Sequence, residues 1–195
     1  MILLYRFITF FIYPLLIIVI YCRKVLKKEA PQRFKEKIFP SHYNIERKKR
    51  ELIWFHAASI GEFKSIIPII IGLNKKYNNL EFLVTTTTFS SGKLAVEEIR
   101  KLKNVKHRYF PVDVGFLIEK FLFLWDPKAI ILVDSEIWPN LITIAKKNEI
   151  PIGLINARIT NKTYNKWMAF PKTAKKIFKC FSFCLASNLE TKKYL

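Results

Sequence analysis

Residues 52–63, LIWFHAASIGEF, decide the fold of this chain. The first five are apolar or aromatic apart from His56, which is typical of a short buried strand. Ser59 then stands three positions before Glu62, at the start of a stretch over 61–77 with apolar residues at helical spacing, and this pattern predicts a capped helix. A strand followed at once by a helix makes one β–α unit.

The same alternation continues through the rest of the chain. Strands that alternate with helices at this spacing form a parallel sheet covered on both faces. The predicted fold class is therefore α/β, a Rossmann-like doubly wound parallel sheet. We expect further strands at 82–86, 107–110, 129–133, 152–155 and 181–186, and helices at 91–102, 117–124, 141–147 and 164–179.

Composition limits the class of protein. The chain has 195 residues, of which 51% are hydrophobic, enough for one globular domain with a membrane segment. That hydrophobic share excludes a disordered chain despite 34 Lys and Arg against 15 Asp and Glu, a net charge of +19. Three cysteines without a CxxC pair exclude a disulfide scaffold, and we predict neither a metal site nor a cofactor.

Residues 1–22 are predicted to anchor the chain in a membrane. Arg6 is their single charge, and the uncharged run at 7–22 is slightly shorter than the ~20 apolar residues of a full span. Pro14 is expected to kink a helix here. The basic residues follow the apolar stretch, which is the reverse of a cleaved signal peptide. We expect an uncleaved helix that either crosses the bilayer or lies in one leaflet; a buried core helix is the less favoured alternative.

Residues 23–50 form a predicted basic juxtamembrane segment. They hold eleven Lys and Arg and three Glu, and residues 161–195 hold eight Lys and one Glu. Positive residues beside a membrane helix stay on the cytoplasmic side, which places the domain at 51–195 against an anionic membrane surface there. Nucleic acid is the rival partner for so basic a chain, but no nucleic-acid-binding module is present, so none is predicted.

In a doubly wound sheet, function belongs to the loops after the carboxyl ends of the strands. In the first loop, 57–63, Ser59 and Glu62 fit a capping box, which is a purely structural role. The alternative is that Gly61 lets a ligand approach while Glu62 projects into a cleft as a general base, if burial raises its pKa toward working pH. In the second loop, 85–93, hydroxyls and a glycine at a helix N-terminus suit a phosphate, although strand threonines and an ordinary cap explain them equally well.

The third loop, ILVDSEIWPN at 131–140, carries the strongest signal. Asp134 and Glu136 end a strand that is otherwise apolar, and Pro139 suits the first turn of the helix that follows. Two carboxylates at one strand end repel each other unless they face a ligand or a cation. A cap would explain one of them, so we expect the pair to be functional.

Five segments occur in an order that resembles one family. They are SIGEF at 59–63, TTTTFSSG at 85–92, YFPVD at 109–113, DSEIWPN at 134–140 and INARIT at 155–160. With its apolar anchor and basic flank, the chain resembles over nearly its whole length the N-terminal half of the bacterial 3-deoxy-D-manno-octulosonic acid (Kdo) transferases.

The resemblance implies a GT-B fold, in which two Rossmann-like domains face each other across a cleft. It implies an inverting glycosyltransferase that moves Kdo from CMP-Kdo to a lipid A precursor at the cytoplasmic side of the cell inner membrane, in lipopolysaccharide biosynthesis. In the family's roles Glu62 is the general base, Asp134 stabilises the transition state and Glu136 is the second acid of the motif. We also assign to substrate binding Ser59, Gly61, Thr87, Asn156 and Arg158.

Three features depart from the family. Asp134 stands where the family has Glu, which shortens its reach by one methylene. The segment QRFKEKIF at 32–39 keeps Arg33 and Glu36 of an early basic motif without its glycines, and we expect it to face the acceptor or the surface. The chain also stops at Leu195, before the second domain, which in the family carries the nucleotide-sugar site and a further catalytic lysine.

The absent second domain bears on activity. We expect this chain alone to bind the membrane and the acceptor without catalysing transfer. The alternative function is a non-catalytic membrane-bound remnant that keeps affinity for lipid and phosphate. A third possibility is another GT-B enzyme that acts on lipid-linked sugars, against which the DSEIWPN and NAR segments argue.

Overall fold

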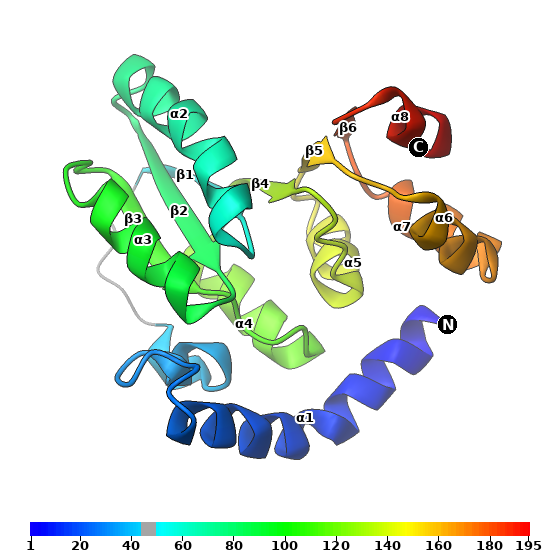
Figure 1. Cartoon of the computed structure of the whole chain (residues 1–195), viewed down its shortest axis with the longest axis horizontal. Helices are drawn as coiled ribbons and strands as arrows, with labels where there is room; N and C mark the ends of the chain where they lie inside the picture. The colour runs from blue at the N-terminus through cyan, green and yellow to red at the C-terminus, as the bar shows by residue number, and fades with distance from the viewer. Residues whose placement is uncertain (44–49) are drawn as a thin grey trace.

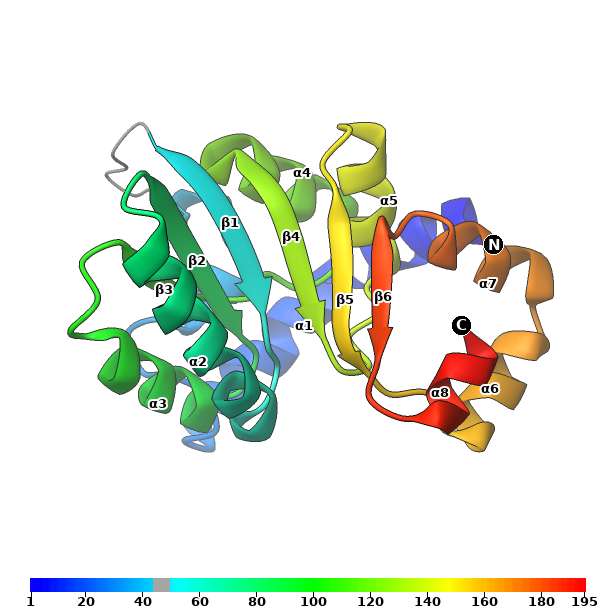
Figure 2. The ribbon, with the colours of Figure 1, turned by 90° about the horizontal axis from the view of Figure 1, so that it is seen from above.

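The computed structural model describes residues 1–43 and 50–195. Its strands are β1 (Glu51–His56), β2 (Leu80–Thr86), β3 (Val105–Tyr109), β4 (Pro127–Val133), β5 (Ile152–Ala157) and β6 (Phe183–Ala186). They form one sheet in the order β3-β2-β1-β4-β5-β6, in which every neighbouring pair is parallel (Figure 2). The predicted Rossmann-like doubly wound parallel sheet is confirmed.

Helices cover both faces of this sheet. On one face lie α2 (Ile60–Lys76) and α3 (Phe89–Ile99), and on the other lie α4 (Gly115–Trp125) and α5 (Pro139–Lys147) (Figure 1). Successive side chains of β1 point to opposite faces of the sheet. Trp54 belongs to the core beneath α4 and α5, whereas Phe55 belongs to the core beneath α2 and α3.

The strand order reverses at β1. β2 and β3 lie on one side of β1, while β4, β5 and β6 lie on the other. The helices that follow the two central strands therefore depart to opposite faces, α2 after β1 and α5 after β4. Such a reversal leaves a crevice outside the carboxyl ends of the central strands, which is where ligands bind in open α/β sheets.

The C-terminal end differs from the prediction in two ways. The helix predicted at 164–179 is two helices, α6 (Asn161–Met168) and α7 (Pro171–Phe178), because Pro171 fits the first turn of the second helix and cannot continue the first. A further short helix, α8 (Leu189–Tyr194), follows β6 and was not predicted; the Asn188 side chain caps it.

The N-terminal helix, α1 (Ile2–Val25), is longer than predicted and runs without a break through Pro14. Its length and apolar composition would allow it to cross a membrane, which is weak evidence for membrane association. It curves past α4 and α5 on the outside of the domain (Figure 1). The Tyr13 ring meets the Phe116 ring edge to face at 5.1 Å, and Arg6 Nε donates to Asn140 Oδ1 at 3.4 Å.

The segment after α1 contains two short 3-10 helices, η1 (Phe34–Lys37) and η2 (Pro40–His42). Of the predicted basic segment at 23–50, residues 44–49 lie outside the described residues. The early basic motif was expected to face the acceptor or the surface, and the surface alternative is wrong for Glu36, which is 7% exposed. Its carboxylate accepts from Arg33 Nε at 2.7 Å and from the Tyr109 N–H at 2.9 Å, so this motif ties the segment to β3.

Candidate active site at the carboxyl edge of the sheet

The two acidic loops of the sequence meet at one edge of the sheet. Glu62 lies in the first turn of α2, just after β1, and Asp134 and Glu136 follow β4. β1 and β4 are adjacent and parallel, so their carboxyl ends lie side by side (Figure 2). The negative charge of Glu136 contributes to the pKa values of both Glu62 and Asp134, so the three carboxylates share one electrostatic environment.

Glu62 is held in a fixed position by its own loop. Its Oε2 accepts from the Ala58 N–H at 2.8 Å and its Oε1 accepts from Ser59 Oγ at 2.7 Å. Ser59 Oγ in turn caps α2 by accepting from the Glu62 N–H at 3.3 Å. The capping interpretation is thus confirmed for Ser59, and the same contacts orient the Glu62 carboxylate at a half-buried position.

Burial raises the pKa of Glu62 above its ordinary value, and the charge of Glu136 raises it further. The donors at Ser59 and Ala58 and the proximity of His56 oppose this shift. A carboxylate whose proton affinity is raised while its orientation is fixed has the two properties that a general base needs.

His56 is a residue of this site that the sequence did not single out. It ends β1, is fully buried, and places Nε2 3.3 Å from Glu136 Oε2. Its Nδ1 lies 2.9 Å from Thr85 Oγ1, on the neighbouring strand. A carboxylate oxygen only accepts, so the hydrogen of the contact with Glu136 belongs to Nε2. The available signal was its place as the polar last residue of an otherwise apolar strand.

Aromatic rings fix the Glu136 carboxylate from the other side. Trp138 Nε1 donates to Glu136 Oε2 at 2.7 Å. Phe110 stacks on the His56 ring with centroids 4.1 Å apart and packs against Trp138 at 5.2 Å. Glu136 therefore receives two ring N–H donors that cannot readily move, because the rings around them are packed together.

Asp134 occupies a strained backbone position. Its φ of 62° lies in the left-handed region, and Asn156, which lies near the carboxyl end of the adjacent β5, has a φ of 51°. Non-glycine residues in this region are strained and cluster at functional sites. Burial raises the pKa of Asp134, Arg158 lowers it and Glu136 raises it. Asp134 Oδ1 is buried without a hydrogen-bond partner among the described residues.

Neither acid of the third loop caps α5. The cap comes from Asp113, whose Oδ2 accepts from the Asn140 N–H at 3.0 Å and whose Oδ1 accepts from the Leu141 N–H at 2.9 Å. Pro139 occupies the first turn, as predicted. Asp134 and Glu136 are consequently left without the structural role that a helix N-terminus would give them.

Most hydroxyl groups of the second loop, 85–93, are engaged in hydrogen bonds within the protein. Thr88 and Ser91 form a capping box at the start of α3, and Ser91 Oγ also donates to the Ala58 carbonyl at 3.1 Å. These contacts favour the structural explanation for the hydroxyls over a phosphate site. Thr87 differs, because its Oγ1 is buried without a partner among the described residues and its carbonyl accepts from Lys37 Nζ at 2.7 Å.

The remaining predicted substrate residues lie at the same edge. Gly61, Asn156 and Arg158 are exposed there. Among the described residues, no group of three or more His, Cys, Asp or Glu is arranged to hold a metal ion.

Solved structures share this fold. A UDP-N-acetylglucosamine 2-epimerase gives a TM-score of 0.53 at 14% identity, covering 75% of this chain and 44% of that one. The S. aureus MnaA–UDP co-structure gives 0.51 at 15% identity, covering 74% and 41%. At such low identity the likeness establishes only the fold, a Rossmann-like α/β domain.

Sequence comparison identifies the family. Residues 31–195 match the model described as 3-deoxy-D-manno-octulosonic-acid transferase (kdotransferase), so the chain belongs to this family. The chain is 37% identical over 164 residues to the Arabidopsis thaliana protein named "Probable 3-deoxy-D-manno-octulosonic acid transferase, mitochondrial", with 84% of this chain and 36% of that protein covered. The corresponding transferase of Rickettsia bellii is 32% identical over 164 residues, with 84% and 38% covered. The chain thus spans little more than a third of the length of these curated relatives, and the predicted family is confirmed.

Proposed function

We propose that this chain is the acceptor-side domain of an enzyme that transfers Kdo from CMP-Kdo to a lipid A precursor in lipopolysaccharide biosynthesis. Membership of the kdotransferase family supports the reaction class. The observation that carries the proposal is the carboxylate of Glu62, oriented by Ser59 and Ala58 beside a second acidic loop at the switch point of the sheet.

In the proposed mechanism Glu62 removes the proton from an acceptor hydroxyl as its oxygen attacks the anomeric carbon of Kdo. The bond to CMP breaks, CMP leaves with the bonding electron pair, and the anomeric configuration inverts. The anomeric centre gains positive character in such a transition state. Asp134, with its unpartnered Oδ1, is placed to stabilise that charge, and Glu136 is held for the same purpose by His56 and Trp138.

The substrate-binding roles follow from position. We assign Gly61 to close approach of the acceptor and Asn156 and Arg158 to its polar groups, because all three are exposed at the carboxyl edge. Ser59 acts through Glu62, and we assign Thr87 to the acceptor because its hydroxyl has no partner among the described residues.

We further propose that α1 lies in one leaflet at the cytoplasmic side of the inner membrane instead of crossing the bilayer. Its polar side chains contact the domain: Tyr5 Oη donates to Asp113 at 3.1 Å, and Arg6 donates to Asn140 and Thr143. A helix that crossed the bilayer would lose these partners, at a cost of several kcal/mol for each polar group left in hydrocarbon. The outward side, in contrast, exposes a row of large apolar residues: Leu3, Phe7, Phe11, Leu15 and Ile18.

The chain by itself is proposed to bind without catalysing transfer, because in a GT-B enzyme the donor site belongs largely to the second domain. Incubation of the 195-residue chain with CMP-Kdo and a lipid A precursor should then yield no product. Turnover by the chain alone would contradict this part of the proposal. A binding remnant is the second candidate function. Joining the chain to a nucleotide-sugar domain from a relative would restore transfer only if the first proposal is correct.

The role of Glu62 is tested by Glu62→Gln in such a completed enzyme. Gln keeps the size of the side chain and removes the base, so kcat should fall by about 10²–10⁴-fold. The matched control is Glu98→Gln, on the exposed face of α3, which should retain the parent kcat. Full activity of Glu62→Gln would remove the general-base assignment.

A further inference from the structure

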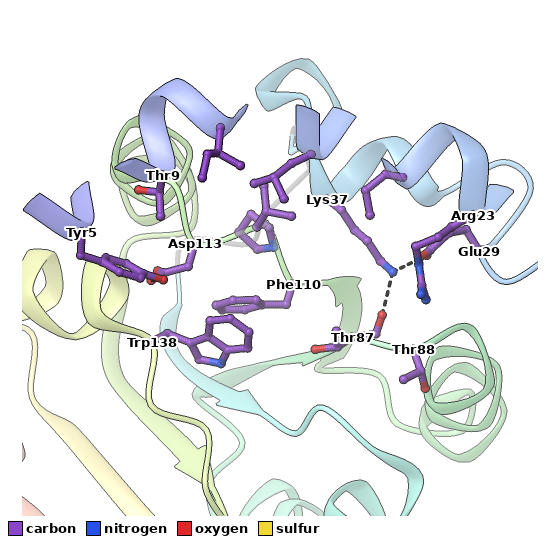
Figure 3. A pocket seen from close by; sticks show the side chains of 15 residues that line it. Tyr5, Thr9, Arg23, Glu29, Lys37, Thr87, Thr88, Phe110, Asp113 and Trp138 are labelled. Atoms are coloured by element: carbon purple, nitrogen blue, oxygen red, sulfur yellow. Dashed lines mark hydrogen bonds and ion pairs between the residues drawn. The ribbon is translucent and has the colours of Figure 1, made fainter. Parts of the chain in front are cut away.

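An apolar pocket lies between α1 and the carboxyl edge of the sheet (Figure 3). Its volume is about 460 Å³, within the range of small-molecule sites. The side chains that give it its character are aliphatic or aromatic: Ile12, Leu16, Ile20, Phe110, Val112 and Trp138. We refer to this space as the α1 pocket.

The charged groups that border the α1 pocket are already paired. At one end Lys37 Nζ donates to Glu29 and to the Thr87 carbonyl, and Arg23 pairs with Glu29 at 2.7 Å (Figure 3). At the other end Tyr5 donates to Asp113. With these groups engaged by one another, the pocket offers contact area for an apolar ligand and few free hydrogen-bonding groups.

The α1 pocket and the candidate active site share a wall. Trp138 lines the pocket and also donates its indole N–H to Glu136. Phe110 lines the pocket and also stacks on His56. Figure 3 shows the two rings together on the wall of the pocket opposite α1. Neither Glu62 nor Asp134 borders the pocket, so a ligand in it would lie beside the reacting groups without touching them.

We propose that the α1 pocket holds one acyl chain of the acceptor lipid and thereby positions its sugar head at the carboxyl edge. This inference rests on the proposed function. The outer side of α1 is apolar and exposed, which would bring the pocket to the level of a lipid leaflet. An acyl chain needs only apolar contact, which this lining supplies.

The shared wall selects the acceptor over bulk phospholipid as the occupant. A chain in the pocket has its head close to Trp138, and hence close to Glu136 and the loop of Glu62. Arg23, which borders the pocket and pairs with Glu29, keeps a side chain that is 42% exposed. A partly exposed arginine at the border of the pocket suits the phosphate of a phosphorylated sugar lipid.

Photo-crosslinking of the 195-residue chain in phosphatidylethanolamine vesicles tests the proposal. One probe is a phosphorylated, acylated glucosamine lipid with a diazirine in one acyl chain, and the other is phosphatidylethanolamine with the same diazirine chain. Mass spectrometry locates the labels. We expect the sugar lipid to label the Phe110–Val112 region and the pocket side of α1, and the phospholipid to label only the outward side of α1, around Phe11 and Leu15.

Two pocket-filling variants and two matched controls sharpen the result. Ile12→Trp and Leu16→Trp place a large ring in the pocket and should reduce pocket labelling by at least about fivefold. Ile18→Trp and Leu15→Trp make the same changes on the exposed side of the same helix and should leave it unaltered. Ile12 is itself 41% exposed, so its replacement is tolerated even if Leu16→Trp disturbs packing.

Pocket labelling that persists in both filling variants, or that is equal with the two probes, would overturn the acyl-chain assignment. Either result would leave the Glu62→Gln comparison intact, because that comparison reports on the chemical step. Loss of transfer activity in Glu62→Gln together with absent pocket labelling would thus reject the pocket and retain the proposed function.

Discussion

His56 and Glu136 are 80 positions apart in the sequence and meet with 3.3 Å between Nε2 and Oε2. The contact joins the ends of β1 and β4, the two strands at which the sheet order reverses. The charge of Glu136 raises the pKa of both Glu62 and Asp134. A residue that holds the Glu136 carboxylate in place therefore also affects the pKa of these two acids. We therefore propose that His56 is a positioning residue for Glu136.

Replacing His56 with Asn in the completed enzyme should lower kcat by about tenfold, since a misplacement of about an ångström has effects of this order. KM should change little, because the imidazole is fully buried. The pH dependence of kcat should shift as well, because a displaced Glu136 alters the proton affinity of Glu62. Steady-state kinetics over a range of pH provides the measurement.

His42→Asn is the matched control for this variant, since His42 is exposed in η2. A purely structural role for His56 would lower thermal stability while leaving the pH profile of the surviving enzyme unchanged, and that outcome would contradict the positioning role.

Much of the fold was accessible from the sequence, for physical reasons. Buried parallel strands such as 129–133 are unbroken apolar runs in the sequence. Once the alternation of strands and helices fixed a parallel sheet, Glu62 and Asp134 had to emerge at the same edge. The meeting of the two acidic loops was therefore predictable without coordinates.

Other contacts carry no local signal. Asp113 caps α5 from 27 positions before Asn140, and no pattern of the kind that revealed Ser59 marks such a distant cap. The polar residues of α1 likewise find partners more than 100 positions away, Tyr5 on Asp113 and Arg6 on Asn140. In the sequence they are isolated polar residues within an apolar segment. Their role becomes apparent only in the folded protein, where α1 packs against the domain.

Two buried groups should act in opposite directions on the pH dependence of stability. Burial and the nearby Arg33 and Arg108 lower the pKa of His107 from 6.5 to about 3. Below pH 6.5 His107 therefore binds a proton in the unfolded chain but stays neutral in the folded protein. The free energy of unfolding consequently decreases as pH falls. Burial raises the pKa of Asp113 from 3.8 to about 6, so between these values the folded protein holds the extra proton and gains stability as pH falls.

Variants separate the two contributions. Between pH 7 and pH 4, the unfolding free energy of the parent minus that of Asp113→Asn should rise as pH falls. The same difference for His107→Gln should decline below pH 6.5. Each pKa unit corresponds to about 1.4 kcal/mol, so urea titrations at several pH values resolve both slopes. Parallel curves for the parent and either variant would contradict the assignment for that residue.

Replacing two helical glycines, Gly92 and Gly72, with alanine should change the free energy of unfolding in opposite directions. A Cβ added at Gly92, in α3, would lie 2.4 Å from Tyr109 Oη and 2.6 Å from the ring, and Tyr109 is only 2% exposed and cannot move aside. Gly92→Ala should therefore lower the free energy of unfolding by about 1–3 kcal/mol through overpacking. Tyr109 also lies beneath the cations of Arg33 and Lys37, at 5.2 and 5.1 Å from its ring centroid, so the same variant should loosen the segment between α1 and β1.

Gly72, in α2, has nothing within 4 Å of an added Cβ. Gly72→Ala should raise the free energy of unfolding by about 0.5–1 kcal/mol, because alanine restricts the unfolded chain and favours a helix. Denaturant titration measures both variants, and limited proteolysis of residues 26–43 reports the loosening expected only for Gly92→Ala. Equal stability of the two variants would mean that Tyr109 does not pack against α3 as described, and the link from Arg33 and Lys37 to β3 would lose its support.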